Sequence, residues 1–162
     1  MRRTYQIVFS EYAGTEALPP DDRQLLAAAV NALEKSYAPY SGFRVGAAAR
    51  LSNGAVVSGA NFENVAYPMC LCAERSTVAA ALSQYPEARI TTLAVTAAST
   101  KHPVTSPAMP CGACRQVLFE VEQKYGQPLR LILQGQAGPI WVFERVSDLL
   151  PLAFGPEMLR FV

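Results

Sequence analysis

The chain has 162 residues, of which 51% are apolar and 17% are charged, and its formal net charge is +1. The length predicts one domain, the composition excludes a disordered chain, and no apolar run reaches the roughly 18 residues of a membrane span. The basic residues form no stripe, which argues against a nucleic-acid polymer as a partner. Four cysteines without a secretory signal favour metal-binding or catalytic thiols and predict a cytoplasmic protein.

Residues 1–20 form an N-terminal extension without a motif, and a weak apolar alternation predicts an edge strand within residues 1–12. Asp21 follows as the expected N-cap of a helix. Apolar residues at every third or fourth position predict that this helix continues to about Tyr37, because Pro39 disfavours further helix.

The remaining elements alternate between strands and helices. A hairpin with an Asn53–Gly54 turn precedes a helix, a strand, a second helix, two short strands and a short helix. The expected ranges are 43–51, 55–60, 72–83, 90–97, 111 onward, 129–133, 140–143 and 146–150. A crossover helix between strands implies some parallel pairing. The order predicts an α/β protein with a three-layer α-β-α fold and a mixed, mostly five-stranded sheet.

Three of the four cysteines are spaced to hold a metal ion. Cys111 and Cys114 lie three residues apart at a predicted helix start, which places both sulfurs on one face, and Cys72 begins the preceding helix. Helix N-termini favour thiolates. Three thiolates on Zn²⁺ leave the fourth position for water, as in a catalytic site. The alternative is a closed structural site that also uses Cys70.

Glu74 separates these two interpretations. It lies two residues after Cys72, where a carboxylate can take a proton from a zinc-bound water and pass it on. A metal ligand followed by x-Glu, and later by Pro-Cys-x-x-Cys, is the signature of zinc-dependent nucleobase deaminases. In a structural site, Glu74 would be only a favourable charge in the first helical turn. The motif therefore favours the catalytic interpretation.

Five motifs carry a resemblance to a known family. They are Tyr37-Ala38-Pro39-Tyr40-Ser41, Phe43-Arg44-Val45-Gly46-Ala47-Ala48, Asn61-Phe62-Glu63-Asn64, Cys72-Ala73-Glu74-Arg75 and Pro110-Cys111-Gly112-Ala113-Cys114-Arg115-Gln116. With them the chain resembles the small, homotetrameric, zinc-dependent cytidine deaminases from about residue 21 to residue 158. The resemblance implies hydrolytic deamination of cytidine and 2′-deoxycytidine in pyrimidine salvage. It also implies one Zn²⁺ per chain and a homotetramer whose active sites are completed by neighbouring subunits.

The resemblance further assigns roles to individual residues. By that analogy, Zn²⁺ is held by Cys72, Cys111 and Cys114. Glu74 would move protons between water, ring N3 and the leaving amine, while Arg75 would offset thiolate charge. The implied substrate contacts are Asn61 and Glu63 at the ribose 3′-hydroxyl, Phe43 and the Ala73 backbone at the base, and Tyr67 and Phe154 from a neighbouring subunit, with the Ala73 backbone accepting from the 4-amino group. The competing interpretations are turn residues for Asn61 and Glu63 and core packing for the aromatic residues.

Other functions compete with this hypothesis. The enzyme alternatives are an aminohydrolase for another cytosine-bearing small molecule and an editing deaminase of RNA or single-stranded DNA, which the absence of a basic groove disfavours. The non-enzyme alternative is an interaction module stabilised by zinc. Two residues fall outside the pattern: Cys70 is expected to be a small buried apolar residue, and His102, the only histidine, is expected to be solvated.

Overall fold

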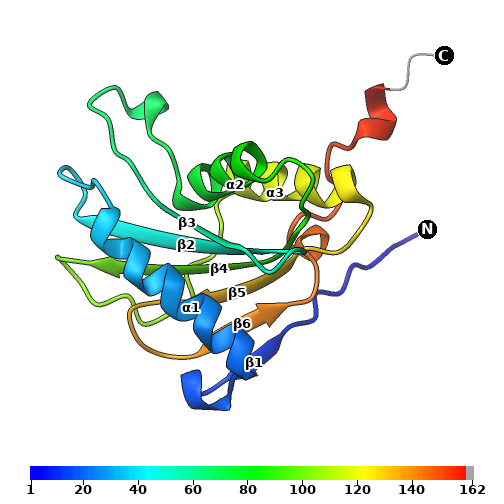
Figure 1. The fold of residues 1–162 in the computed structure, drawn as a ribbon. Helices are drawn as coiled ribbons and strands as arrows, with labels where there is room; N and C mark the ends of the chain where they lie inside the picture. Colours follow the sequence, from blue (N-terminus) through cyan, green and yellow to red (C-terminus); the bar gives the residue numbers. More distant parts are fainter. Residues whose placement is uncertain (160–162) are drawn as a thin grey trace.

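The computed structural model describes residues 1–159, which form one mixed sheet with helices on both faces (Figure 1). The strands are β1 (Ser10–Tyr12), β2 (Phe43–Leu51), β3 (Val56–Ala60), β4 (Ile90–Ser99), β5 (Arg130–Gln134) and β6 (Ile140–Phe143). The α-helices are α1 (Pro20–Ala32), α2 (Ala73–Gln84) and α3 (Gly112–Tyr125), and 3₁₀ turns cover Thr15–Ala17, Leu33–Lys35, Tyr67–Met69, Val146–Leu149 and Pro156–Leu159. Within residues 1–159, every helix is too short or too polar to cross a membrane.

The strands are ordered β1-β6-β5-β4-β2-β3, and only β4 and β5 pair in parallel. Helix α3 makes the crossover between these two strands. Helix α1 covers one face of the sheet and α2 and α3 cover the other, which confirms the three-layer α/β prediction (Figure 1). The sheet has six strands rather than five because the N-terminal segment adds an edge.

Small residues on β2 bring the helices close to the sheet. Ala48 belongs to the apolar cluster under α1, while Ala47 and Ala49 belong to the cluster under α2 and α3. At Gly46, a Cβ atom would collide with the backbone of Ala29 in α1, so this approach requires glycine. Because helices cover both faces of β2, small residues suit this strand, which explains its run of alanines. The packing of β2 also positions its first residue, Phe43, a candidate site residue.

The N-terminal extension forms less strand than its alternation predicts. Only Ser10–Tyr12 pairs, antiparallel to β6, and residues 5–9 lie outside the strand. Phe9 packs its ring against Trp141 at 4.7 Å and Phe143 at 5.2 Å between centroids. Aromatic packing therefore holds residue 9 in place. The sequence pattern predicts strand hydrogen bonds at this position instead.

The start of α1 also differs from the prediction. Pro19 is the N-cap and Pro20 the first helical residue, a position that suits proline because its missing N–H has no helical partner. Asp21, the expected N-cap, lies exposed in the first turn. The α-helix ends at Ala32 and continues only as the 3₁₀ turn Leu33–Lys35, short of Tyr37.

Asp22 links the start of α1 to the sheet through ion pairs. Its side chain is buried, and Arg130 of β5 donates to both carboxylate oxygens at 3.1 and 3.0 Å. Arg50 of β2 lies 3.6 Å from Oδ1. Without the Asp22 carboxylate, Arg50 would keep no ion pair among the described residues and Arg130 would keep only that with the exposed Glu144. Removing the carboxylate should therefore cost more than a surface pair is worth.

We therefore expect Asp22→Ala to lower the free energy of unfolding by about 3 kcal/mol. Denaturant unfolding of the zinc-loaded protein at fixed concentration measures this loss. Asp21→Ala removes a neighbouring carboxylate that is exposed, so it is the matched control and should change stability by no more than about 0.5 kcal/mol. Equal effects of the two substitutions would contradict the role of the buried ion pairs.

Candidate active site

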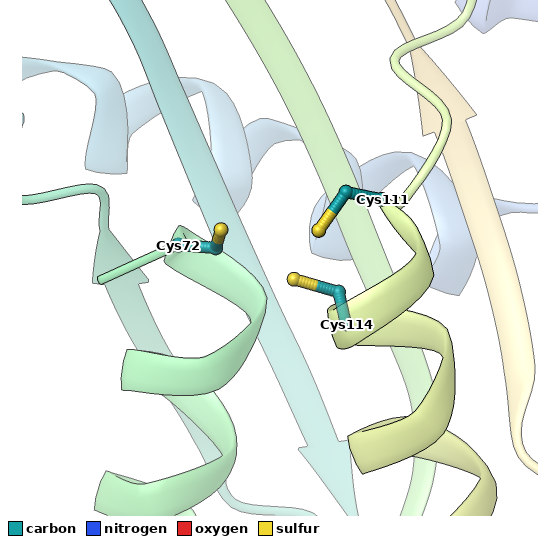
Figure 2. A group of neighbouring side chains, drawn as sticks. All are labelled: Cys72, Cys111 and Cys114. Carbon is teal, nitrogen blue, oxygen red and sulfur yellow. The ribbon is translucent and has the colours of Figure 1, made fainter. Parts of the chain in front are cut away.

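Two helix N-termini bring three cysteines together. Cys72 is the N-cap of α2, Cys111 is the N-cap of α3, and Cys114 lies in the first turn of α3. Their sulfur atoms all lie within 4.8 Å of one another and point into the gap between the helices (Figure 2). Cys114 is buried, Cys72 is half-buried and Cys111 is exposed, so the cluster opens to one side.

Cys70 does not belong to this cluster. Among residues 1–159, the group of metal-binding side chains contains Cys72, Cys111 and Cys114 alone. The sulfur of Cys70 instead accepts a hydrogen bond from the Asn64 N–H at 3.2 Å. The closed four-cysteine site is therefore not formed, because the Cys70 sulfur is held by the backbone of Asn64 and lies outside the cluster.

The three cysteine side chains hydrogen-bond to one another. The Cys114 side chain hydrogen-bonds to Cys72, which, with smaller help from Cys111 and the charge of Arg75, lowers the pKa of the Cys72 thiol to about 6. The same contact, together with burial, raises the pKa of Cys114. A set of clustered sulfurs that already stabilises one thiolate fits Zn²⁺, which binds thiolates and releases their remaining protons.

Glu74 lies in the first turn of α2, beside the sulfurs. Only 5% of this residue is exposed. Burial raises the pKa of its carboxyl, against opposing hydrogen bonds from its own backbone N–H and from Cys114. A carboxyl with a raised pKa takes up and releases protons nearer to neutral pH than an exposed glutamate does. The position is therefore suited to proton transfer next to a metal site.

A cavity of about 490 Å³ opens over this centre. It collects six residues predicted from the sequence: Phe43, Asn61, Glu63, Cys72, Glu74 and Cys111. Tyr67 and Phe154 are not in its lining and are 70% and 59% exposed. Arg75 is half-buried on α2, outside the cavity lining. One chain thus supplies the metal-binding and sugar-binding candidates, but not the two candidate intersubunit aromatics.

Asn61 has one hydrogen-bond donor left. Its Oδ1 accepts from the Val45 N–H at 2.8 Å and from the Ser36 hydroxyl, while its Nδ2 donates to the Phe43 carbonyl at 2.9 Å. These two backbone partners fix which end of the amide is oxygen. An amide nitrogen has two hydrogens, so one N–H of Asn61 remains for a ligand.

Glu63 has one acceptor position left. Its Oε2 accepts from the N–H groups of Tyr40 and Ser41 at 2.9 and 3.2 Å, and its Oε1 accepts from the Ser41 hydroxyl. These hydrogen bonds, led by that of the Ser41 hydroxyl, lower the pKa of Glu63. A carboxylate offers about four acceptor positions. The three donors therefore leave roughly one, on Oε1.

The backbone of Ala73 lies at the start of α2 and is partly engaged within that helix. Its carbonyl, expected to accept from a substrate amine, accepts from the Ser76 hydroxyl at 2.9 Å inside α2. Its N–H is the first of the helix and has no partner within it. The free polar group of Ala73 is thus a donor, because a carbonyl at a helix start is turned toward the helix.

Several site residues carried no recognised signal in the sequence. The loop before α3 contributes Val104 and residues 106–109 to the cavity. Its sequence is rich in Ser, Thr and Pro and predicts only a connecting loop. Only its position directly before Pro110-Cys111 hinted at this placement. Cys70 is half-buried in the cavity lining, not a fully buried apolar residue, whereas His102 is exposed as expected and lies outside the lining.

Comparisons with known proteins agree with this geometry. The family description "Cytidine and deoxycytidylate deaminase zinc-binding region" matches residues 19–125. A cytidine deaminase from Halalkalibacterium halodurans is 41% identical over 138 residues, which cover 85% of this chain and 96% of that protein. One from Mycobacterium tuberculosis is 41% identical over 131 residues, 81% of this chain and 87% of that protein.

A solved structure supports the same relationship. The crystal structure of cytidine deaminase from Burkholderia pseudomallei superposes with a TM-score of 0.69 at 41% identity, covering 81% of this chain and 97% of that one. The match spans the sheet architecture as well as the sequence, and the three-cysteine cluster supplies the donors that a zinc-binding family needs. The chain therefore belongs to the zinc-dependent cytidine deaminase family.

Proposed function

We propose that this chain catalyses the hydrolytic deamination of cytidine and 2′-deoxycytidine to uridine and 2′-deoxyuridine, with release of ammonia. The observation that carries the proposal is the buried carboxyl of Glu74 beside three clustered thiols, at the base of a cavity large enough for a nucleoside. Residues 1–162 would act as one catalytic domain with an N-terminal extension, in pyrimidine nucleoside salvage. The reduced thiols of the centre suit the cytoplasm.

Glu74 is the proposed proton carrier of the reaction. Cys72, Cys111 and Cys114 would hold one Zn²⁺ per chain, which supplies the positive charge that makes a water nucleophilic at neutral pH. The Glu74 carboxylate takes a proton from the attacking water and delivers it to ring N3, while the water oxygen adds to C4. It then carries the second proton of the water to the 4-amino group, which leaves as ammonia. Arg75 would offset part of the negative charge of three thiolates.

Asn61 and Glu63 are the proposed sugar contacts. A hydroxyl both donates and accepts, and these side chains retain one N–H donor and roughly one carboxylate acceptor position. The 3′-hydroxyl of a nucleoside satisfies both, whereas a 3′-phosphate would place negative charge against Glu63. This favours free nucleosides over an internal nucleotide of a strand. At the base, Phe43 would pack on the ring, and the Ala73 N–H would donate to the 2-oxo group.

Tyr67 and Phe154 are the proposed contributions from neighbouring subunits. Both are largely exposed and lie outside the cavity lining of their own chain. Large exposed aromatic residues commonly mark interfaces. The Phe154 carbonyl accepts from Gln116 of α3 at 2.9 Å, so the backbone at Phe154 is tied to the helix that starts at the metal centre. We propose a homotetramer in which these aromatics complete adjacent sites.

The first experiment follows the absorbance change of cytidine and 2′-deoxycytidine on mixing with purified protein. Metal content and light-scattering mass are determined on the same sample. Turnover of both nucleosides with about one zinc per chain and a tetrameric mass is the expected result. Zinc without turnover of either nucleoside would refute the proposed reaction, and an active monomer would refute the shared active sites.

A further inference from the structure

The loop before β2 presents Ser41 to the sugar-binding carboxylate. The Ser41 hydroxyl donates to Oε1 of Glu63 and accepts from the Phe43 N–H at 2.9 Å. One hydroxyl thus joins the carboxylate proposed to contact the sugar to the backbone of the residue proposed to contact the base. None of the functions assigned above uses this side chain.

The backbone of this loop is held independently of the hydroxyl. Gly42 adopts a left-handed φ of 68°, where a side chain would also collide with Thr100. The Gly42 N–H donates to the Ala38 carbonyl at 3.0 Å, and the Gly42 carbonyl accepts from the Thr100 N–H at 3.2 Å. The loop therefore remains in place when only the Ser41 hydroxyl is removed, and the two backbone N–H bonds to Oε2 remain with it.

Those two backbone bonds do not fix the Glu63 carboxylate completely. Both converge on Oε2, so the carboxylate can still pivot about that atom. The Ser41 hydroxyl is the only group among the described residues that donates to Oε1, the oxygen with the remaining acceptor position. Ser41 therefore determines where that position lies relative to the Asn61 N–H.

We propose that Ser41 is a specificity-determining positioning residue, which orients Glu63 so that a nucleoside 3′-hydroxyl can donate to Glu63 and accept from Asn61 together. This inference rests on the proposed sugar contact and adds to it the group that aims the carboxylate. It predicts that removing the Ser41 hydroxyl lowers kcat/KM for substrates that have a 3′-hydroxyl and leaves kcat/KM unchanged for substrates that lack one. A residue that only supports the loop would affect both kinds of substrate alike.

The test compares kcat/KM for cytidine, 2′-deoxycytidine and 3′-deoxycytidine in the zinc-loaded wild-type protein and in Ser41→Ala. The variant should lose about tenfold with the two 3′-hydroxyl substrates, mainly through KM, and change little with 3′-deoxycytidine. Ser41→Thr keeps a hydroxyl and should retain most of the wild-type preference for substrates with a 3′-hydroxyl. Ser52→Ala removes a similarly exposed turn hydroxyl that accepts from the Arg89 N–H at the other end of β2, and it should leave all three values unchanged.

A double-mutant cycle with Glu63→Gln isolates the coupling. Once Glu63→Gln has removed the preference for a 3′-hydroxyl, adding Ser41→Ala should not change it further. Equal losses on all three substrates, or an unchanged preference in Ser41→Ala, would overturn the role of Ser41 and leave the proposed reaction intact. A wild-type enzyme that does not distinguish cytidine from 3′-deoxycytidine would overturn the sugar contact itself, and the Ser41 role with it.

Discussion

Glu74→Gln should abolish nearly all turnover while leaving zinc content and fold intact. The substitution keeps the shape of the side chain and removes its ability to accept and return a proton. General acid–base groups contribute about 10²–10⁴-fold to rates. Because one carboxyl would serve both proton transfers here, we expect a loss near the upper end, about 10⁴-fold in kcat.

Metal content separates proton transfer from metal binding. Glu74 lies outside the set of three clustered sulfurs, so its replacement should retain about one zinc per chain. Glu120→Gln changes an exposed glutamate on α3 and serves as the matched control for both kcat and zinc. Loss of zinc in Glu74→Gln would make Glu74 a ligand, and retained turnover would assign the proton transfers to another group.

The metal centre could be predicted from the sequence because it depends on local spacing. Cys111 and Cys114 share a helix face by periodicity, and Cys72 starts a helix whose first turn carries Glu74. The hairpin was predictable for the same reason, since Asn53–Gly54 permits the turn and Gly54 adopts φ 85°. Only the approach of Cys72 to Cys111 and Cys114 joins segments that are distant in the chain. The order of the motifs along the sequence predicted that approach.

Contacts between distant segments could not be predicted in this way. Asp22 pairs with Arg130 across 108 positions, and nothing near Asp22 distinguishes it from Asp21. The N-cap lies at Pro19, two residues before the expected Asp21, and the buried Asp22 faces the sheet. The Ser41–Glu63 contact spans 22 positions and likewise depends on how the loop before β2 packs.

Cys114→Ala should lose zinc, and with it the stability that zinc provides. Cys114 is fully buried within 4.8 Å of the other two sulfurs, and among residues 1–159 no fourth metal-binding side chain belongs to this group to take its place. The variant should contain almost no zinc after dialysis. Cys70→Ala is the matched control, since Cys70 is a thiol two residues from Cys72 that makes no contact with the cluster, and it should retain about one zinc per chain.

The stability effect follows from linkage between metal binding and folding. A ligand present at 1,000 times its dissociation constant stabilises the native state by about 4 kcal/mol. A chelator should therefore lower the unfolding free energy of the wild-type protein by an amount of this order and leave that of Cys114→Ala unchanged. Cys111→Ser, at an exposed position, should lose the same zinc-dependent part without a packing defect, which separates metal loss from cavity formation. A chelator effect that persists in both variants would exclude the three sulfurs as the zinc site.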